Sequence, residues 1–343
     1  MQKKQILIIL ILFLAGCGNS QTRVDSNFSI NFGCNKNYGL SFPPFADQEQ
    51  IDFSLEQMDA LDIERIRIAI DWRNREPQQG EYYWEPMDYR MKRASENNIS
   101  VLLSVPAIGP EWACGGENEC VLHEDHFRRY VKNIVTRYNI DKIQFGNEWE
   151  ERSAEDHVRL NNILYNVTKE YSPQTQVVLG GITRAYPMIE LYCNQNEDLD
   201  FSDLEFSSGY SEEKLLKRVE QEICPSNMSE NVLYVFRNAK YEMIDIQLYD
   251  DPLNWPDYIK ILPGDKPIIV SEFGGPSSVF EKTNQKYQAK RLKDYLETIE
   301  SLPIEEAYHF KLVDTDYSYH KDSGLFDKRL KKKEAYEVFQ ACT

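Results

Sequence analysis

The hydrophobic and polar positions of this chain follow two periods. Short apolar runs, rich in β-branched residues, indicate buried strands. Seven such runs occupy residues 63–71, 99–106, 141–148, 175–182, 243–250, 266–274 and 306–314, and an earlier one is predicted between Phe28 and Phe42. Segments with apolar residues at helical spacing lie between them, at residues 47–62, 85–98, 123–138, 153–171 and 283–300. The chain is therefore predicted to alternate strands with helices.

This alternation predicts an α/β fold, a single (β/α)8 TIM barrel. Strands that are joined through helices pair in parallel, and eight such units in a chain of 343 residues fit that architecture. An open doubly wound sheet is the alternative, but no GxGxxG turn follows the first strand. No linker-like tract or internal repeat divides the chain, so we expect one barrel domain over residues 28–343.

The ends of the predicted strands carry the candidate chemistry, because reacting groups in such barrels lie at the carboxyl ends of strands. Glu148 ends the fourth strand, Glu272 lies at the end of the seventh, and Tyr249 at the end of the sixth. Two carboxylates on one rim can hydrolyse a glycosidic bond, since one protonates the leaving oxygen and the other attacks the sugar or activates water. Arg67 would hold one carboxylate ionised, and the Asn147 amide can bind a sugar hydroxyl.

Several motifs resemble those of the clan A glycoside hydrolases. They are "RIRIAIDW" at the second strand, "GNE" at the fourth, "SEFGG" at the seventh and "GLFDKRLKKKEAYEVF" near the C-terminus. The resemblance implies a retaining hydrolase of β-linked glycosides, with Glu148 as acid/base and Glu272 as nucleophile. It also implies that Asn147 binds the 2-hydroxyl of the sugar, and that Arg67 and Tyr249 support the nucleophile.

The chain departs from the clan's pattern at two places. Gln247 stands two residues before the sixth-strand Tyr, where members often have His, and the eighth strand reads "YHFKL" where they have Trp. We therefore expect Phe310 or another aromatic residue to form the platform beneath the reacting sugar. Lys311 and His309 are candidates to reach the site.

Other aromatic and histidine residues leave two interpretations open. Trp72 and Trp112 can either stack on sugars or cap the barrel core. His123 and His126 have an HxxH spacing, but they begin a charged helix and lack a third ligand, so a solvated helix face is expected rather than a metal site. The predicted hydrolysis needs no metal and no cofactor.

The first twenty residues, "MQKKQILIILILFLAGCGNS", predict export. Two lysines precede an apolar run that is shorter than the roughly 20 residues of a membrane span, and the run stops at small residues. "LAGC" resembles the bacterial lipobox, which implies cleavage before Cys17 and lipidation of that cysteine. We expect a signal peptide over residues 1–16, a tether over 17–27 and a lipid anchor in the bacterial cell envelope. An ordinary cleaved signal with an incidental cysteine is the alternative.

Six cysteines remain after Cys17, and an even number in an exported chain favours disulfides. Six cysteines allow fifteen pairings. Proximity in the sequence and the closure of a barrel favour Cys114 with Cys120, Cys193 with Cys224, and Cys34 with Cys342.

Charge and composition limit the classes of molecule that the protein is expected to bind. The net charge of −17 becomes −19 once Lys3 and Lys4 leave with the signal, and so acidic a surface disfavours nucleic acid. An aromatic content of 12% provides platforms for sugar rings. We expect a monomer that binds a carbohydrate substrate and contacts the membrane only through its anchor. The rivals are a catalytically silent carbohydrate-binding lipoprotein and a structural envelope protein; two opposed carboxylates argue against the first, and an aromatic-rich rim argues against the second.

Overall fold

The computed structural model describes residues 37–42, 48–115, 121–150, 153–195, 199, 217, 220–221, 224, 226–249, 251–274, 285–316, 320 and 322–343. The predicted signal peptide and tether, with Cys17, lie outside the described residues, as do Cys34 and Cys120. Among the described residues, no helix combines the length and the apolar character that crossing a bilayer requires.

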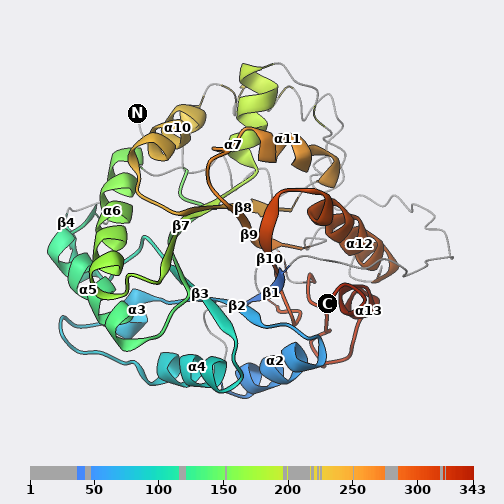
Figure 1. Cartoon of the computed structure of the whole chain (residues 1–343), viewed down its shortest axis with the longest axis horizontal. Helices are drawn as coiled ribbons and strands as arrows, with labels where there is room; N and C mark the ends of the chain where they lie inside the picture. Colours follow the sequence, from blue (N-terminus) through green and yellow to red (C-terminus); the bar gives the residue numbers. More distant parts are fainter. Residues whose placement is uncertain are drawn as a thin grey trace.

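Eight parallel strands close into a barrel, seen end-on in Figure 1. In chain order they are β1 (Asn37–Phe42), β2 (Arg65–Ala69), β3 (Ser100–Val105), β6 (Lys142–Asn147), β7 (Gln176–Ile182), β8 (Met243–Leu248), β9 (Ile268–Phe273) and β10 (Ile304–His309). Each strand pairs with the next, and β10 pairs with β1, which closes the ring. The prediction of a single (β/α)8 barrel is confirmed.

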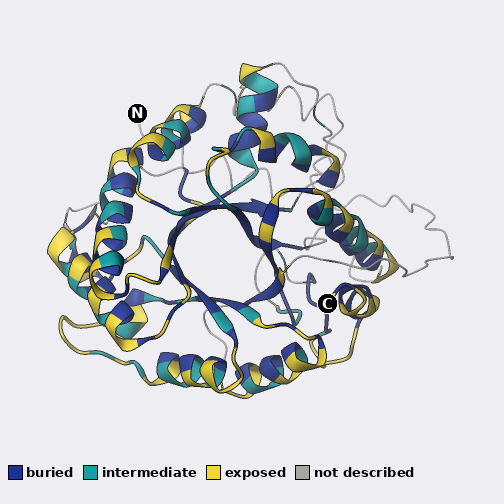
Figure 2. Cartoon of the chain, in the orientation of Figure 1, coloured by how far each residue is buried: buried dark blue, intermediate teal, exposed yellow. Residues whose placement is uncertain are grey.

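Helices surround the barrel, with their buried sides facing the strands and their exposed sides facing outward (Figure 2). They are α2 (Gln48–Ala60), α3 (Trp72–Arg75), α4 (Glu85–Glu96), α5 (Glu124–Arg137), α6 (Ala154–Tyr171), α7 (Ala185–Met188), α10 (Met228–Asn238), α11 (Trp255–Lys260), α12 (Gln285–Ser301) and α13 (Glu334–Gln340). The connections hold the 3-10 helices η1 (Glu111–Ala113) and η4 (Pro252–Asn254), the π-helix η2 (Ile189–Asn194), and the antiparallel pair β4 (Cys114–Gly115) and β5 (Val121–Leu122). All five predicted helices are present, within two residues at each end.

Local sequence sets where these helices begin. The Ser153 hydroxyl accepts the Asp156 N–H at 3.2 Å and caps α6, and the acids of its first turn suit the positive end of the helix dipole. In α4, Pro86 stands at the start, where its missing N–H costs no helical hydrogen bond.

Side chains alternate between the two faces of the strands, which divides the buried residues into two sets. The large core lies between strands and helices and includes Val101 and Leu103. A small separate cluster fills the barrel interior and consists of Leu102, Val178, Met243, Ile269 and Tyr308. Polar side chains lie at both ends of that interior, with Arg65, Lys142 and Glu306 near the amino ends of their strands and Arg67, Gln144 and Asp245 farther along.

Candidate active site

Glu272 lies near the end of β9 and is 8% exposed. The Arg67 guanidinium donates from Nη1 to Oε1 at 2.6 Å, and the Tyr249 hydroxyl donates to Oε2 at 2.6 Å. Both carboxylate oxygens therefore accept a hydrogen bond, which fixes the plane of the group.

Arg67 is buried, and each of its three guanidinium nitrogens donates. Nε donates to Gln144 Oε1 at 3.2 Å, and Nη2 donates to Asn147 Oδ1 at 2.8 Å. The hydroxyls of Ser41 and Ser104 accept at 3.3 and 3.4 Å. A fixed cation thus joins four strands to the carboxylate on β9.

Asn147 ends β6, and its side-chain oxygen accepts from both Arg67 Nη2 and Gln247 Nε2, the latter at 2.7 Å. Because the oxygen has both donors, the amide NH₂ points away from them. Gln247, the position where the clan often has His, therefore orients the Asn147 amide.

Glu148 follows directly and is exposed at the rim. Its φ of 49° and the φ of 81° at Gly146 are left-handed, and its N–H donates to the Gly181 carbonyl at 3.0 Å. Non-glycine residues rarely adopt this conformation, which is frequent at functional sites. At Gly146 a Cβ would lie 2.9 Å from the His157 ring, so the turn requires glycine there.

The two residues after Glu148 anchor the turn. The Trp149 indole donates to the Gly180 carbonyl at 2.8 Å and stacks on His157 at 4.2 Å between ring centroids. Glu150 is buried and accepts the Thr183 N–H. These contacts hold the backbone that presents Glu148.

Tyr249 completes the cluster. Burial raises its pKa well above 10, and the negative charge of Glu272 and, to a smaller degree, of Glu148 add to the effect. The hydroxyl therefore keeps its proton and donates to Glu272. The negative charge of Glu148 thus acts on the same phenol as that of Glu272.

A buried acid lies beneath the rim. Asp245 accepts from Gln144 Nε2 at 2.6 Å and from the Ser271 N–H at 2.7 Å. Burial raises its pKa to about 6, while the Arg67 charge opposes the rise. No motif in the sequence indicates Gln144 or Asp245, although each is a polar residue inside an apolar strand.

The end of β10 holds the residues proposed to replace the clan's Trp. Phe310 is half-buried, its peptide with Lys311 is cis, and its N–H donates to the Phe273 carbonyl at 2.7 Å. Lys311 is buried and donates to Thr315 at 2.5 Å; burial lowers its pKa to about 8. His309 packs between Phe273 and Phe339 of α13, on the outer side of the strand, so the expectation that it reaches the site is wrong.

Trp72 is fully buried, which corrects the sugar-stacking interpretation for this residue. Its indole donates to Glu76 Oε2 at 2.8 Å, and its ring stacks on Tyr130 at 4.5 Å. Trp112 is half-buried, meets the Trp72 ring edge-to-face at 5.9 Å and donates to the Glu76 carbonyl. Trp72 therefore caps the core, and Trp112 packs against it.

Cys193 and Cys224 form a disulfide with Cα atoms 5.4 Å apart, as predicted. Cys114 and Cys342 are also disulfide-bonded, but their predicted partners lie outside the described residues, so those pairings stay predictions. Within the described segments, His, Cys, Asp and Glu residues form no group of three that could hold a metal ion.

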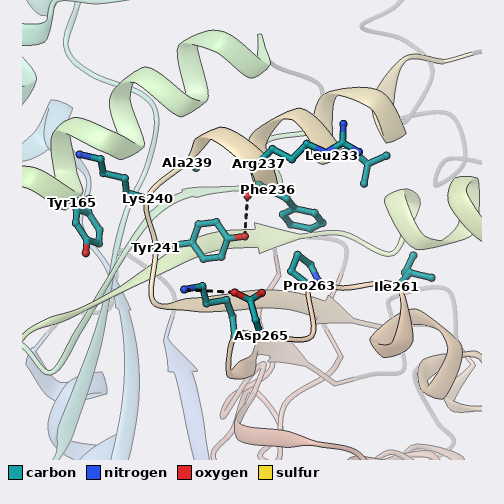
Figure 3. Close-up of a pocket in the computed structure, with 11 residues that line it drawn as sticks. Tyr165, Leu233, Phe236, Arg237, Ala239, Lys240, Tyr241, Ile261, Pro263 and Asp265 are labelled. Carbon is teal, nitrogen blue, oxygen red and sulfur yellow. Dashed lines mark hydrogen bonds and ion pairs between the residues drawn. The ribbon is translucent and has the colours of Figure 1, made fainter.

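A groove of about 790 Å³ lies near the amino ends of β8 and β9, whereas the candidate active site lies at the carboxyl ends of the strands (Figure 3). It is lined by the segments before β8 and β9 and by parts of α6 and α10, including Tyr165, Phe236 and Tyr241. The Tyr241 hydroxyl donates to the Phe236 carbonyl at 3.1 Å. None of the acids of the candidate active site lines this groove.

The sequence matches a family of glycoside hydrolases over part of its length. Residues 42–141, less than a third of the chain, match the model of glycoside hydrolase family 42, described as beta-galactosidase. None of the curated proteins compared with the chain matches it in sequence.

Solved structures of glycoside hydrolases share the fold. The exo-β-1,4-mannosidase Op5Man5 from Opitutaceae bacterium strain TAV5 has a TM-score of 0.63 at 14% identity, and the match covers 93% of this chain and 61% of that one. GH5_18 from Streptomyces cattleya, in complex with GlcNAc, has a TM-score of 0.65 at 10% identity over 90% and 79% of the two chains. A β-galactosidase from the psychrophilic Marinomonas ef1 has 0.58 at 12% identity over 89% and 58%. The chain thus spans only about three fifths of the first of these proteins, and identities this low establish the fold alone.

Proposed function

We propose that this protein is a retaining glycoside hydrolase that cleaves β-linked glycosides. The observation that carries the proposal is the pair of strand-end carboxylates, Glu272 bonded by Arg67 and Tyr249, and Glu148 exposed on the same rim. The partial match to family 42 and the glycosidases that share the fold support the same class.

The first step divides the work between the two acids. A Glu272 oxygen attacks the anomeric carbon while the Glu148 carboxyl gives its proton to the glycosidic oxygen, and the aglycone leaves. Because Arg67 and Tyr249 hold both Glu272 oxygens, the nucleophile is positioned before the substrate arrives. A glycosyl ester on Glu272 results.

The second step uses the same groups in reverse. Glu148, now a carboxylate, takes a proton from water, and the water attacks the anomeric carbon and expels Glu272. Two inversions give net retention. This chemistry needs a separation of about 5 to 5.5 Å between the carboxyl groups, against about 6.5 Å or more for inversion, and the shorter value remains our prediction.

Asn147 suits the sugar 2-hydroxyl. Arg67 and Gln247 occupy its oxygen, so the amide can donate to the substrate, and such a bond strengthens as charge develops in the transition state. Phe310 is our candidate platform for the reacting sugar. We further propose that the enzyme is exported and anchored through Cys17; loss of membrane association in Cys17→Ser would support the anchor.

Hydrolysis of a panel of aryl β-galactosides, β-glucosides and β-mannosides and of polysaccharides tests the proposal. Wild type should turn over at least one substrate with a β-configured first product by anomeric proton NMR, and Glu272→Gln should not. Glu305→Gln, at an exposed position of β10, is the matched control and should keep wild-type activity. Sugar binding without hydrolysis would instead indicate the silent carbohydrate-binding lipoprotein.

A further inference from the structure

A closed ring of contacts includes the proposed nucleophile, Glu272. The Tyr249 hydroxyl bonds Glu272, and the Tyr249 ring stacks on His320 with centroids 4.2 Å apart and planes at 23°. The Phe310 ring meets the His320 ring edge-to-face at 5.7 Å. The Phe310 N–H returns to β9 by donating to Phe273, the neighbour of Glu272.

The side of this ring of contacts formed by β9 and Phe310 is tightly packed. Gly274 has a φ of 154°, and a Cβ there would lie 2.4 Å from the Phe310 carbonyl oxygen, so the two segments approach as closely as glycine permits. Tyr249, by contrast, lies beyond the last residue of β8 and has two rotatable side-chain bonds. A phenol at such a position needs a packing partner to keep its hydroxyl aimed at one oxygen.

We infer that His320 is a positioning residue, whose ring holds the Tyr249 ring in place so that the phenol hydroxyl stays on the Glu272 carboxylate. The inference rests on the proposed function and adds to it a residue that no sequence motif indicates. His320 acts through Tyr249 and is assigned no contact with substrate.

The charge state of His320 fits a packing role. Burial lowers its pKa to about 3, and the nearby cations Lys311 and Arg184 act in the same direction. The acids across Tyr249 are Glu272 and Glu148. His320 is therefore neutral throughout the range in which a glycosidase works, and the stack contributes without a proton transfer.

Kinetics of three variants test the inference. We expect His320→Ala to lower kcat about 10-fold and to leave KM within about 2-fold of wild type. The aromatic stack stabilises the position of the Tyr249 ring, and its loss corresponds to roughly that factor in rate. His320→Phe keeps the ring without the nitrogens and should restore kcat to within about 2-fold of wild type. The pH profile should be unchanged in both. In a Tyr249→Phe background, His320→Ala should cost less than about 2-fold more, since the hydroxyl it positions is gone.

Two kinetic results would overturn the inference: a Phe variant as slow as the Ala variant, or equal losses from His320→Ala in both Tyr249 backgrounds. A wild type that hydrolyses no glycoside would instead overturn the proposed function, and crystal structures then decide the positioning role separately. The Tyr249 hydroxyl should remain near 2.6 Å from Glu272 in His320→Phe and move out of hydrogen-bond range in His320→Ala. An unchanged contact in the Ala variant, with an unchanged melting temperature, rejects the inference.

Discussion

The barrel encloses two clusters built from the same three residue types. The first is Arg67, Glu272 and Tyr249 near the carboxyl ends of the strands, and the second is Arg65, Glu306 and Tyr308 nearer the amino ends. In the second, Glu306 accepts from Arg65 at 3.2 Å through one oxygen and from the Tyr308 hydroxyl at 2.9 Å through the other. Each cluster thus holds a glutamate between a guanidinium and a phenol.

Their surroundings differ in ways that decide what each can do. Glu306 has a second cation, Lys142 at 2.9 Å, and Tyr308 belongs to the apolar cluster that fills the barrel. Glu272 has an exposed second acid, Glu148, on the same rim, and Tyr249 feels the charge of both. We therefore expect the second Arg–Glu–Tyr cluster to stabilise the barrel, and the first, which shares its rim with a second carboxylate, to take part in catalysis.

Matched Glu→Gln substitutions should separate the two clusters most strongly. Glu272→Gln removes the nucleophile, so we expect kcat to fall by about 10⁴-fold or more. Glu306→Gln leaves Arg65 and Lys142 without a carboxylate, which should lower the free energy of unfolding by about 3–5 kcal/mol. Kinetics per folded molecule and chemical denaturation measure both. An inactive but stably folded Glu306→Gln would remove the distinction.

Glu148→Ala tests the acid that the second cluster lacks. Substrates with poor leaving groups should lose about 10²- to 10⁴-fold in rate, while activated aryl glycosides keep their first step and slow in the second. Azide needs no general base, so it should restore turnover and give the β-glycosyl azide. In Glu272→Ala, azide should give the α-product. A β-azide from that variant would reverse the two assignments.

Asp245, which lies beneath the first cluster, makes the free energy of unfolding depend on pH. Burial raises its pKa to about 6, whereas an unfolded Asp titrates near 3.9. The folded state holds this proton more tightly, so the associated stabilisation is complete below about pH 4 and is lost as pH rises through 6. Across that range the unfolding free energy of wild type should fall by about 3 kcal/mol relative to Asp245→Asn. Asp265→Asn, at an exposed loop carboxyl, controls for the lost charge; parallel wild-type and Asp245→Asn curves would contradict this account.

Substitution of the tyrosine in each cluster, Tyr249 or Tyr308, should have the smallest effects. A hydrogen bond to a charged group contributes about 1.5–3 kcal/mol. Tyr249→Phe should therefore lower kcat by about 10- to 100-fold. Tyr308→Phe should instead lower the free energy of unfolding by a similar energy and leave kcat within about 2-fold of wild type. Equal effects of the two substitutions on kcat would show that both clusters take part in catalysis.

The alternation of apolar runs was sufficient to predict the barrel and the rim. Because barrel strands end on one face, the strand-end residues Asn147, Glu148, Tyr249 and Glu272 could be placed together without any tertiary information. Arg67 lies inside β2, and the resemblance to clan A implied its place beside the nucleophile. Gln144 and Asp245 were also within reach, since a polar residue at an inward position of an apolar strand must pair with another polar group.

Positions set by long-range packing were not predictable. Trp72 follows a strand, but its burial depends on a stack with Tyr130 and a bond to Glu76, neither of which a periodicity reveals. His309 points to α13, a helix that the pattern did not indicate. His320 lies beyond the last strand, and only the folded chain brings it to Tyr249.

The central claim is that Glu272 is the nucleophile of a double displacement. A 2-deoxy-2-fluoro glycoside with a good leaving group should trap the glycosyl-enzyme, and peptide mass spectrometry then locates the attached sugar. We predict one sugar per chain, on Glu272, absent from Glu272→Gln and released when an acceptor sugar is added. A label on Glu148 or Glu306, or turnover of the parent glycoside with inverted product and no label, would contradict the account.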